Sequence, residues 1–199
     1  MSRTKPVNKN LIQSKIILSV FIFFILFLLT AAGCSSSPSS QYDSNYLLTA
    51  EIARSKAAVL NVKIPQGWFT AEDNECNCID LWLIKDDYSA TLNFVVLNVD
   101  SLTIKTIKND ELNAITEISK VFKKIKYGKN FKGFTNEETF VLNTKIFTAY
   151  EYHDESNRNI RVVVFKANDK FFELSAIPVK TENLSGLYKI QNSVLSSIK

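Results

Sequence analysis

Short runs of alternating hydrophobic and polar residues predict a first group of β-strands in the middle of the chain. Residues 57–65 form the first run, which Pro65 ends, and the letters WFTAE after a turn at QGW predict a short return strand. Residues 79–85 and 90–99 come next, with the polar stretch DDYS between them. This spacing predicts that the last two runs pair as a β-hairpin.

A second group of strands follows later in the chain. The stretch ETFVLNTKIFTAYEYH is expected to be bent or broken near Asn143 and Thr144, and NIRVVVFKAN and KFFELSAIPV come after it. The polar turns DESNRN and NDK separate these runs. Short turns between strands favour antiparallel pairing, so we expect an antiparallel sheet.

Two segments carry apolar residues at the three- or four-residue spacing of a helix. The first has Asp110 as its expected N-cap and Gly128 at its expected end, and its apolar positions are Leu112, Ile115, Ile118, Phe122 and Ile125. The second has Thr181 as its expected N-cap and Glu182 in its first turn, and its apolar positions are Leu184, Leu187, Tyr188, Val194, Leu195 and Ile198. We expect both amphipathic helices to cover the sheet, which gives an α+β layered domain.

The N-terminus has the three-part pattern of a secretory signal. Residues 1–15 are polar and positively charged, residues 16–29 are apolar, and the letters TAAGC then supply small side chains. The apolar run is short of the roughly 20 residues that a membrane-spanning helix prefers. We therefore expect an N-terminal signal helix within a signal peptide of residues 1–33.

The end of this leader, Ala31-Ala32-Gly33-Cys34, resembles the lipobox of bacterial lipoproteins, with Ala31 where that motif usually has leucine. The resemblance implies cleavage after Gly33 and a diacylglycerol on the Cys34 thiol, with a further acyl chain such as palmitate on the new amino terminus. Each buried CH₂ contributes about 0.8 kcal/mol of membrane affinity, so such chains anchor a soluble domain firmly. An uncleaved anchor helix and ordinary secretion with a free Cys34 thiol are the alternatives.

Residues 34–45, which are the lipidated cysteine and a serine-rich stretch, are expected to form a flexible tether, and residues 46–199 a single globular domain. The formal charge of +4 comes from four basic residues of the leader. Without them, 20 basic residues stand against 20 acidic ones, so the argument for a nucleic-acid partner is lost. We expect a protein of the bacterial cell envelope, lipid-anchored to a membrane and facing the periplasm or exterior.

The order of these elements resembles the PsbP-like superfamily, which includes bacterial lipoproteins of the DcrB-like type. The letters IPQGW after the first strand, a long hairpin, a middle helix, the letters DKFFELSAIP and a closing helix with SVLSSIK carry the resemblance over residues 57–199. It implies an α-β-α sandwich around an antiparallel sheet. It implies no catalytic motif, no enzyme activity and no cofactor.

The letters NECNC place Cys76 and Cys78 two positions apart, next to acidic residues. In an oxidising compartment this pair suggests a disulfide, although a Cys-x-Cys ring is tight. Two free or intermolecular thiols, a metal site and a redox centre are the alternatives. A metal site would need further ligands, and the chain offers only His153 and carboxylates without zinc-type spacing, so we expect no metal.

Six lysines gather at the end of the middle helix, with no acidic residue between Glu117 and Glu137. They are Lys120, Lys123, Lys124, Lys126, Lys129 and Lys132. Such a patch suits anionic lipid headgroups, lipopolysaccharide phosphates or an acidic protein partner. Alternatively, the lysines complement the helix dipole and keep an exposed face in solution.

Three aromatic residues and one histidine are further candidates. Trp68, Phe69 and Trp82 suit a ligand groove, but the pattern LWLI favours Trp82 in the core and Trp68 at the end of the sheet. His153 stands beside acidic residues as a general base would, but a histidine in a polar turn fits better because no nucleophile motif accompanies it.

These observations favour a membrane-anchored, extracytoplasmic lipoprotein with a non-enzymatic accessory or partner-binding role, whose partners are the membrane and an envelope protein. A small-ligand or metal-binding module that uses the Cys76 and Cys78 region is the alternative function. An enzyme is the third possibility, and no recognised catalytic constellation supports it.

Intact mass spectrometry of the mature protein tests the two cysteine predictions together. We expect a mass without residues 1–33 and with added acyl chains at Cys34, and a gain of two hydrogens with reductant if Cys76 and Cys78 are bonded. A mass that still includes the leader would contradict the lipoprotein interpretation. A mass that reductant leaves unchanged would contradict the disulfide.

Overall fold

The computed structural model describes residues 42–57, 60–71, 78–99, 110–180 and 183–198. Its elements in chain order are β1 (Leu48–Arg54), β2 (Asn61–Pro65), β3 (Trp68–Ala71), β4 (Leu81–Lys85), β5 (Ala90–Leu97), α3 (Glu111–Tyr127), the 3₁₀ turn η2 (Gly128–Asn130), β6 (Phe134–Leu142), β7 (Lys145–His153), β8 (Asn159–Ala167), β9 (Lys170–Pro178) and α4 (Leu184–Ser196). The chain divides into two units, Met1–Ser39 and Ser40–Lys199. The predicted signal helix, Gly33 and Cys34 lie in the first unit, outside the described residues.

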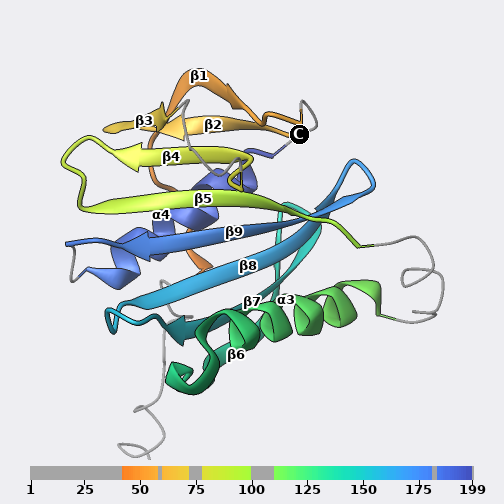
Figure 1. The fold of residues 1–199 in the computed structure, drawn as a ribbon. Coiled ribbons are helices and arrows are strands. Elements are labelled where there is room, and N and C mark those ends of the chain that lie inside the picture. The colour runs from red at the N-terminus through yellow and green to blue at the C-terminus, as the bar shows by residue number, and fades with distance from the viewer. Residues whose placement is uncertain (1–41, 58–59, 72–77, 100–109, 181–182, 199) are drawn as a thin grey trace, which may run out of the picture. The chain divides into compact units, whose positions relative to one another are not determined.

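Seven strands of the second unit form one antiparallel sheet in the order β3-β4-β5-β9-β8-β7-β6. The expected hairpin of β4 and β5 is present. Eight residue pairs join β5 to β9, from Ala90 opposite Pro178 to Leu97 opposite Phe171. This long pairing joins the early strand group to the late one, so the α+β prediction with an antiparallel sheet is confirmed (Figure 1).

Two strands form a separate small sheet that the sequence pattern described poorly. β1 pairs with β2 in antiparallel register, with Arg54 opposite Asn61 and a bulge further along. Our prediction missed β1 because its exposed residues show no clean alternation of buried and exposed positions. The predicted strand over residues 57–65 is present only from Asn61, and residues 58–59 lie outside the described residues.

The long stretch near Asn143 and Thr144 is two strands and not one. Both residues adopt left-handed backbone conformations, with φ of 47° and 68°, and they join β6 to β7 as a two-residue hairpin turn. Asn168 and Asp169 have the same kind of geometry between β8 and β9, with φ of 47° and 60°. The expected break is confirmed, and both turns set the register of the strands that flank them.

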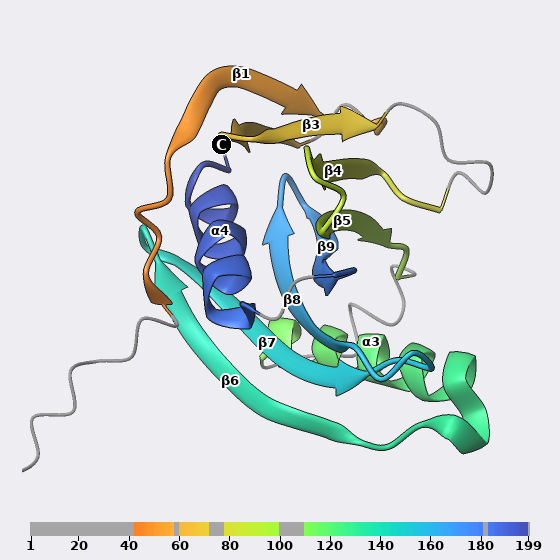
Figure 2. The same ribbon diagram turned by 90° about the vertical axis from the view of Figure 1, so that its left-hand side faces the viewer.

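The two helices lie on opposite faces of the seven-stranded sheet (Figure 2). Alternate residues of β8 show the division, because Val162 and Val164 pack with Ile115 of α3 whereas Val163 and Phe165 belong to the core beneath α4. Since both faces are covered, the central strands are buried along nearly their whole length. This is the α-β-α sandwich that the sequence predicted.

The N-cap of α3 is the predicted residue, whereas the N-cap of α4 is not. Helix α3 begins after Asp110 as expected, but within the described chain the Asp110 side chain makes no capping hydrogen bond and its φ is 61°. Helix α4 begins after Asn183, whose side chain accepts a hydrogen bond from the Gly186 backbone N–H at 2.9 Å. The prediction of Thr181 as N-cap was therefore wrong, and Thr181 itself lies outside the described residues.

A fully buried arginine on β8 fixes the packing beneath α4. Arg161 has an exposed fraction of 0%, and its Nη1 donates to Gln191 Oε1 and Asn192 Oδ1, both at 2.9 Å and both on α4. Its Nη2 donates to Glu138 Oε1 on β6 at 3.1 Å. A buried charge must be paired and hydrogen-bonded, so these contacts determine which side of α4 faces the sheet.

Part of the predicted tether belongs to this packing. Tyr42 donates to Glu138 Oε2 at 2.5 Å, and its ring lies 5.5 Å from that of Phe140. Asp43 forms an ion pair with Lys189 of α4 at 3.0 Å. Residues 42–45 therefore lie against the domain, and a flexible tether is left for residues 34–41 as a prediction.

Replacing Arg161 with methionine should reduce the free energy of unfolding by about 3–5 kcal/mol, because the Glu138 carboxylate, whose side chain is only 16% exposed, loses its positively charged partner. Denaturant unfolding measures this loss. Arg158→Met is the matched control, since Arg158 pairs with Asp154 at 2.5 Å but its side chain is 38% exposed. We expect a loss of about 1 kcal/mol or less there, and equal losses in the two variants would contradict the role of Arg161.

Candidate functional site

A buried polar cluster lies between α3 and the sheet. Glu173 on β9 has an exposed fraction of 2%, and its Oε2 accepts from Lys123 Nζ at 2.6 Å. The Ser119 hydroxyl donates to the other oxygen of this carboxylate and lies 2.5 Å from the Tyr150 hydroxyl. Burial, together with the nearby Glu173 charge, raises the pKa of Tyr150 well above its ordinary value. The cluster therefore places a polar side of α3 against the sheet.

Part of the apolar surface of α3 faces outward near the end of the helix. Val121, Phe122 and Ile125 have exposed fractions of 48%, 54% and 71%. At about 3.6 residues per turn, Val121 and Ile125 lie on nearly the opposite side of the helix from Ser119 and Lys123, and Phe122 lies about 80° from them. The expectation that the apolar stripe covers the sheet is thus confirmed at Leu112, Ile115 and Ile118 and wrong at Phe122 and Ile125.

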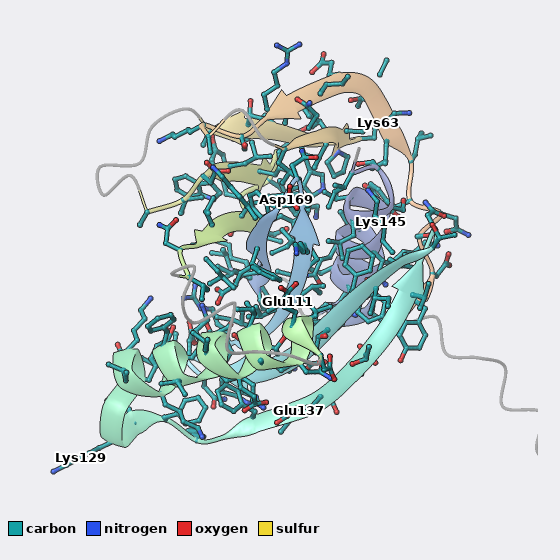
Figure 3. The ribbon with its side chains drawn as sticks, turned by 90° about the vertical axis from the view of Figure 1, so that its right-hand side faces the viewer. Lys63, Glu111, Lys129, Glu137, Lys145 and Asp169 are labelled. Atoms are coloured by element: carbon teal, nitrogen blue, oxygen red, sulfur yellow. The ribbon has the colours of Figure 1, made fainter. Side chains whose placement is uncertain are left out.

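Two of the six predicted patch lysines are held in ion pairs within the domain. Lys123 bonds to Glu173, as described above. Lys120 is 7% exposed and contacts Glu117 at 2.6 Å and Glu137 at 2.7 Å; Glu137 lies on β6 beside α3 (Figure 3). Burial disfavours the charged form of Lys120, but the two carboxylates outweigh this effect and raise its pKa. Both lysines are therefore structural.

The other four patch lysines are exposed at the surface. They are Lys124, Lys126, Lys129 and Lys132. Lys129 projects outward beyond the end of α3 (Figure 3), whereas Lys132 donates to Asn157 Oδ1 at 2.8 Å. We define the α3 outer surface as Val121, Phe122 and Ile125 together with Lys124, Lys126 and Lys129. It combines exposed apolar side chains with positive charge on one helix and the turn that follows it.

The cysteine region is partly described. Cys78 is disulfide-bonded; the other two cysteines, Cys34 and Cys76, lie outside the described residues, so the predicted pairing with Cys76 stays a prediction. Within the described part of the chain, no group of three or more His, Cys, Asp or Glu residues is placed to hold a metal ion. The expectation of no metal at NECNC likewise stays a prediction, because Glu75 lies outside that part.

A cavity near this region has a volume of about 640 Å³ and is lined by residues of β1, β2, β3 and β4, including Trp82, and by Asp80 just before β4. The Asp80 Oδ2 and Trp82 Nε1 atoms are buried and have no hydrogen-bond partner among the described residues. Trp82 is half-buried and not a core residue as expected, because Leu81 and Leu83 occupy the core side of β4. Residues 72–77, which follow β3 in the chain, lie outside the described residues.

The three candidate aromatic residues do not meet in one groove. Trp68 is 6% exposed and lines a different cavity from Trp82, and Phe69 is partly exposed and packs edge-on against Tyr88 at 5.9 Å between ring centroids. The alternative of one ligand groove lined by all three residues is therefore wrong, since Trp68 and Trp82 line two different cavities and Phe69 lines neither of them.

His153 lies half-buried at the end of β7, opposite Asn159 of β8. Its neighbour Asp154 accepts hydrogen bonds from the Arg158 backbone N–H at 2.9 Å and from Arg158 Nε at 2.7 Å. The carboxylate beside His153 thus holds a turn in place. This arrangement agrees with a histidine at a strand end and gives no support to a general base.

Comparisons with known proteins address the fold. No family model matches the chain, and no curated protein matches its sequence. The solution structure of cyanobacterial PsbP (CyanoP) from Synechocystis sp. PCC 6803 matches with a TM-score of 0.54 and 13% identity, over 84% of this chain and 97% of that one. The chain therefore carries a domain with the PsbP-like fold, as its order of elements predicted.

Two further solved structures match less well. LpqN, involved in cell envelope biogenesis of Mycobacterium tuberculosis, has a TM-score of 0.41 and 13% identity, over 70% of this chain and 82% of that one. A protein of unknown function from Pseudomonas aeruginosa has a TM-score of 0.36 and 9% identity, over 74% and 94% of the two chains. These scores are too low to establish a shared fold. In the described residues, no helix is both long and apolar enough to cross a membrane.

Proposed function

We propose that this chain is a non-enzymatic accessory lipoprotein of the cell envelope, anchored through Cys34 and held against an anionic membrane by its α3 outer surface. The observation that carries the proposal is the outward direction of Phe122 and Ile125, which are 54% and 71% exposed beside exposed lysines. Exposed apolar side chains of this size on one helix face mark an interaction site.

The chemistry of this surface matches a bilayer interface. Helices that lie in the plane of a membrane carry lysines around an apolar face, so that the apolar side chains enter the boundary between headgroups and acyl chains. Each lysine near an anionic surface contributes about 1 kcal/mol of attraction. Lys124, Lys126 and Lys129 supply this charge, and Val121, Phe122 and Ile125 supply the apolar contact.

The anchor would keep the domain close to this membrane. Cys34 and Tyr42 are separated by a short segment, which reaches about 28 Å when fully extended at roughly 3.5 Å per residue. Tyr42 is already held against β6 by its bond to Glu138. A lipid on Cys34 therefore raises the effective concentration of membrane at the domain, so that even weak contacts of the α3 outer surface are populated.

The charge pattern favours a membrane over an acidic protein. The α3 outer surface has lysine and no arginine. Lysine is a hydrated point charge, which suits a diffuse layer of headgroups better than the bidentate, planar recognition of a single carboxylate or phosphate group.

The non-enzymatic role has its own support in the buried charged residues. Arg161 and Glu173 are both engaged in bonds that hold helices on the sheet.

Fluorescence quenching by brominated lipids in the anchored, full-length protein tests this proposal. A tryptophan introduced as Ile125→Trp should be quenched in vesicles that contain phosphatidylglycerol, and much less in vesicles of phosphatidylcholine alone. Adding Lys124→Glu and Lys126→Glu should weaken the quenching by at least tenfold in effective affinity, because two attractive charges become repulsive.

Ile146→Trp is the matched control, since Ile146 is 58% exposed on β7, lies opposite Val141 and does not belong to the α3 outer surface. It should show little quenching in either vesicle. Equal quenching at positions 125 and 146, or none at 125, would contradict the membrane contact. Crosslinking from position 125 to an acidic envelope protein, without quenching, would replace the membrane with a protein partner.

A further inference from the structure

A second cavity, distinct from the α3 outer surface, lies where the start of α4 meets the edge of the sheet. It has a volume of about 290 Å³ and is lined by side chains from β3, β4, β5 and α4. The residues that matter for its chemistry are Trp68, Lys85, Ser89, Ala90, Leu187 and Ile190. Its size is close to the lower end of the range for small-molecule sites.

Trp68, which lines this cavity, carries a hydrogen-bond donor that no described residue satisfies. Trp68 is only 6% exposed, and its indole Nε1 is buried without a hydrogen-bond partner among the described residues. A buried tryptophan N–H normally finds an acceptor, since leaving a buried donor unmet costs free energy. The cavity that Trp68 lines is the place where a ligand would bring that acceptor.

The same cavity has positive potential at its rim. Asn183 and Gly186, at the N-terminus of α4, line it, and the N-terminal end of a helix carries a partial positive charge. Lys85 Nζ bonds to Asp87 at 2.9 Å and to Ser89 at 3.0 Å, which leaves the third ammonium proton for a ligand.

The rest of the lining is apolar and rigid. Ala90, Leu187 and Ile190 have exposed fractions of 1%, 3% and 7% and belong to the main core. Lysines on the rim are each paired with one aspartate, Lys85 with Asp87 and Lys189 with Asp43. This near balance of charge suits a single negative charge better than a phosphate dianion.

We propose that this cavity binds a small organic carboxylate, with its apolar body against Ala90, Leu187 and Ile190 and its carboxylate accepting from Trp68 Nε1 and Lys85. The inference stands apart from the proposed membrane contact, because it involves other residues and a different part of the fold. No covalent step is involved, and the site is one of binding alone.

Nuclear magnetic resonance of the full chain in lipid nanodiscs, with ¹⁵N only in the tryptophan indole nitrogens, tests the proposal. The chain has two tryptophans, so the spectrum contains two indole signals. Phenylacetate should move the Trp68 signal downfield in a saturable way and leave Trp82 in place, because Trp82 lines the other cavity. The neutral analogue phenylacetamide should bind about fivefold more weakly, since a charged acceptor makes the stronger hydrogen bond.

Four variants complete the test, with binding measured from the signals of the probe itself. Trp68→Phe should weaken phenylacetate binding roughly tenfold, and Trp82→Phe should not change it. Lys85→Met should remove the preference for phenylacetate over phenylacetamide. Lys166→Met is its control, because Lys166 pairs with Glu111 at 2.9 Å as Lys85 pairs with Asp87.

Several results would overturn the proposal. These are the absence of a saturable shift at Trp68, equal shifts of both indole signals, or unchanged binding to Trp68→Phe. Equal affinity for the acid and the amide would overturn the assignment of a carboxylate. None of these outcomes depends on whether the α3 outer surface contacts a membrane.

Discussion

The ion pair of Glu173 with Lys123 constrains the rest of this structure. Glu173 lies on β9, a central strand, and its carboxylate is buried beneath α3. Removing one partner from such a pair costs about 3–5 kcal/mol, so the helix must present Lys123 and Ser119 to the sheet. Because those residues face inward, Val121 and Ile125 on the opposite side of the helix face outward, and Phe122 beside them is 54% exposed. A requirement of the core thus creates the surface on which the proposed membrane contact depends.

A buried charge also constrains the packing of the helix on the opposite face of the sheet. Arg161 on β8 is buried beneath α4 and bonds to Gln191 and Asn192 of that helix. Each helix therefore provides hydrogen-bonding partners for a charge that the sheet buries, in addition to covering apolar side chains. We infer that these polar bonds select the rotation of each helix about its axis, since apolar packing alone tolerates several rotations.

Local patterns in the sequence predicted the strands and turns well. Alternation gave the hairpins around DDYS and NDK, and the break at Asn143 and Thr144 agrees with residues that tolerate positive φ. Other features depend on residues that are distant in the chain. Glu173 is 50 positions from Lys123, so periodicity along α3 alone placed Phe122 and Ile125 on the buried side.

The same limit explains what was missed at the candidate sites. The pattern LWLI favoured Trp82 in the core, but the pairing partners of Trp68 and Trp82 in the sheet and the position of α4 decide which cavity each one lines. The prediction missed strand β1 because this strand pairs with β2 in a small sheet and exposes most of its residues. In both cases the deciding contacts are tertiary.

The rotation of α3 is the central claim, and solvent accessibility at two phenylalanines tests it most directly. With 4-fluorophenylalanine at position 122 or 171, a soluble gadolinium chelate should broaden the fluorine signal at 122 and leave the signal at 171 sharp. Phe122 is 54% exposed and Phe171, beneath α3, is 2% exposed. A signal at 122 that is as protected as the one at 171 would contradict the account.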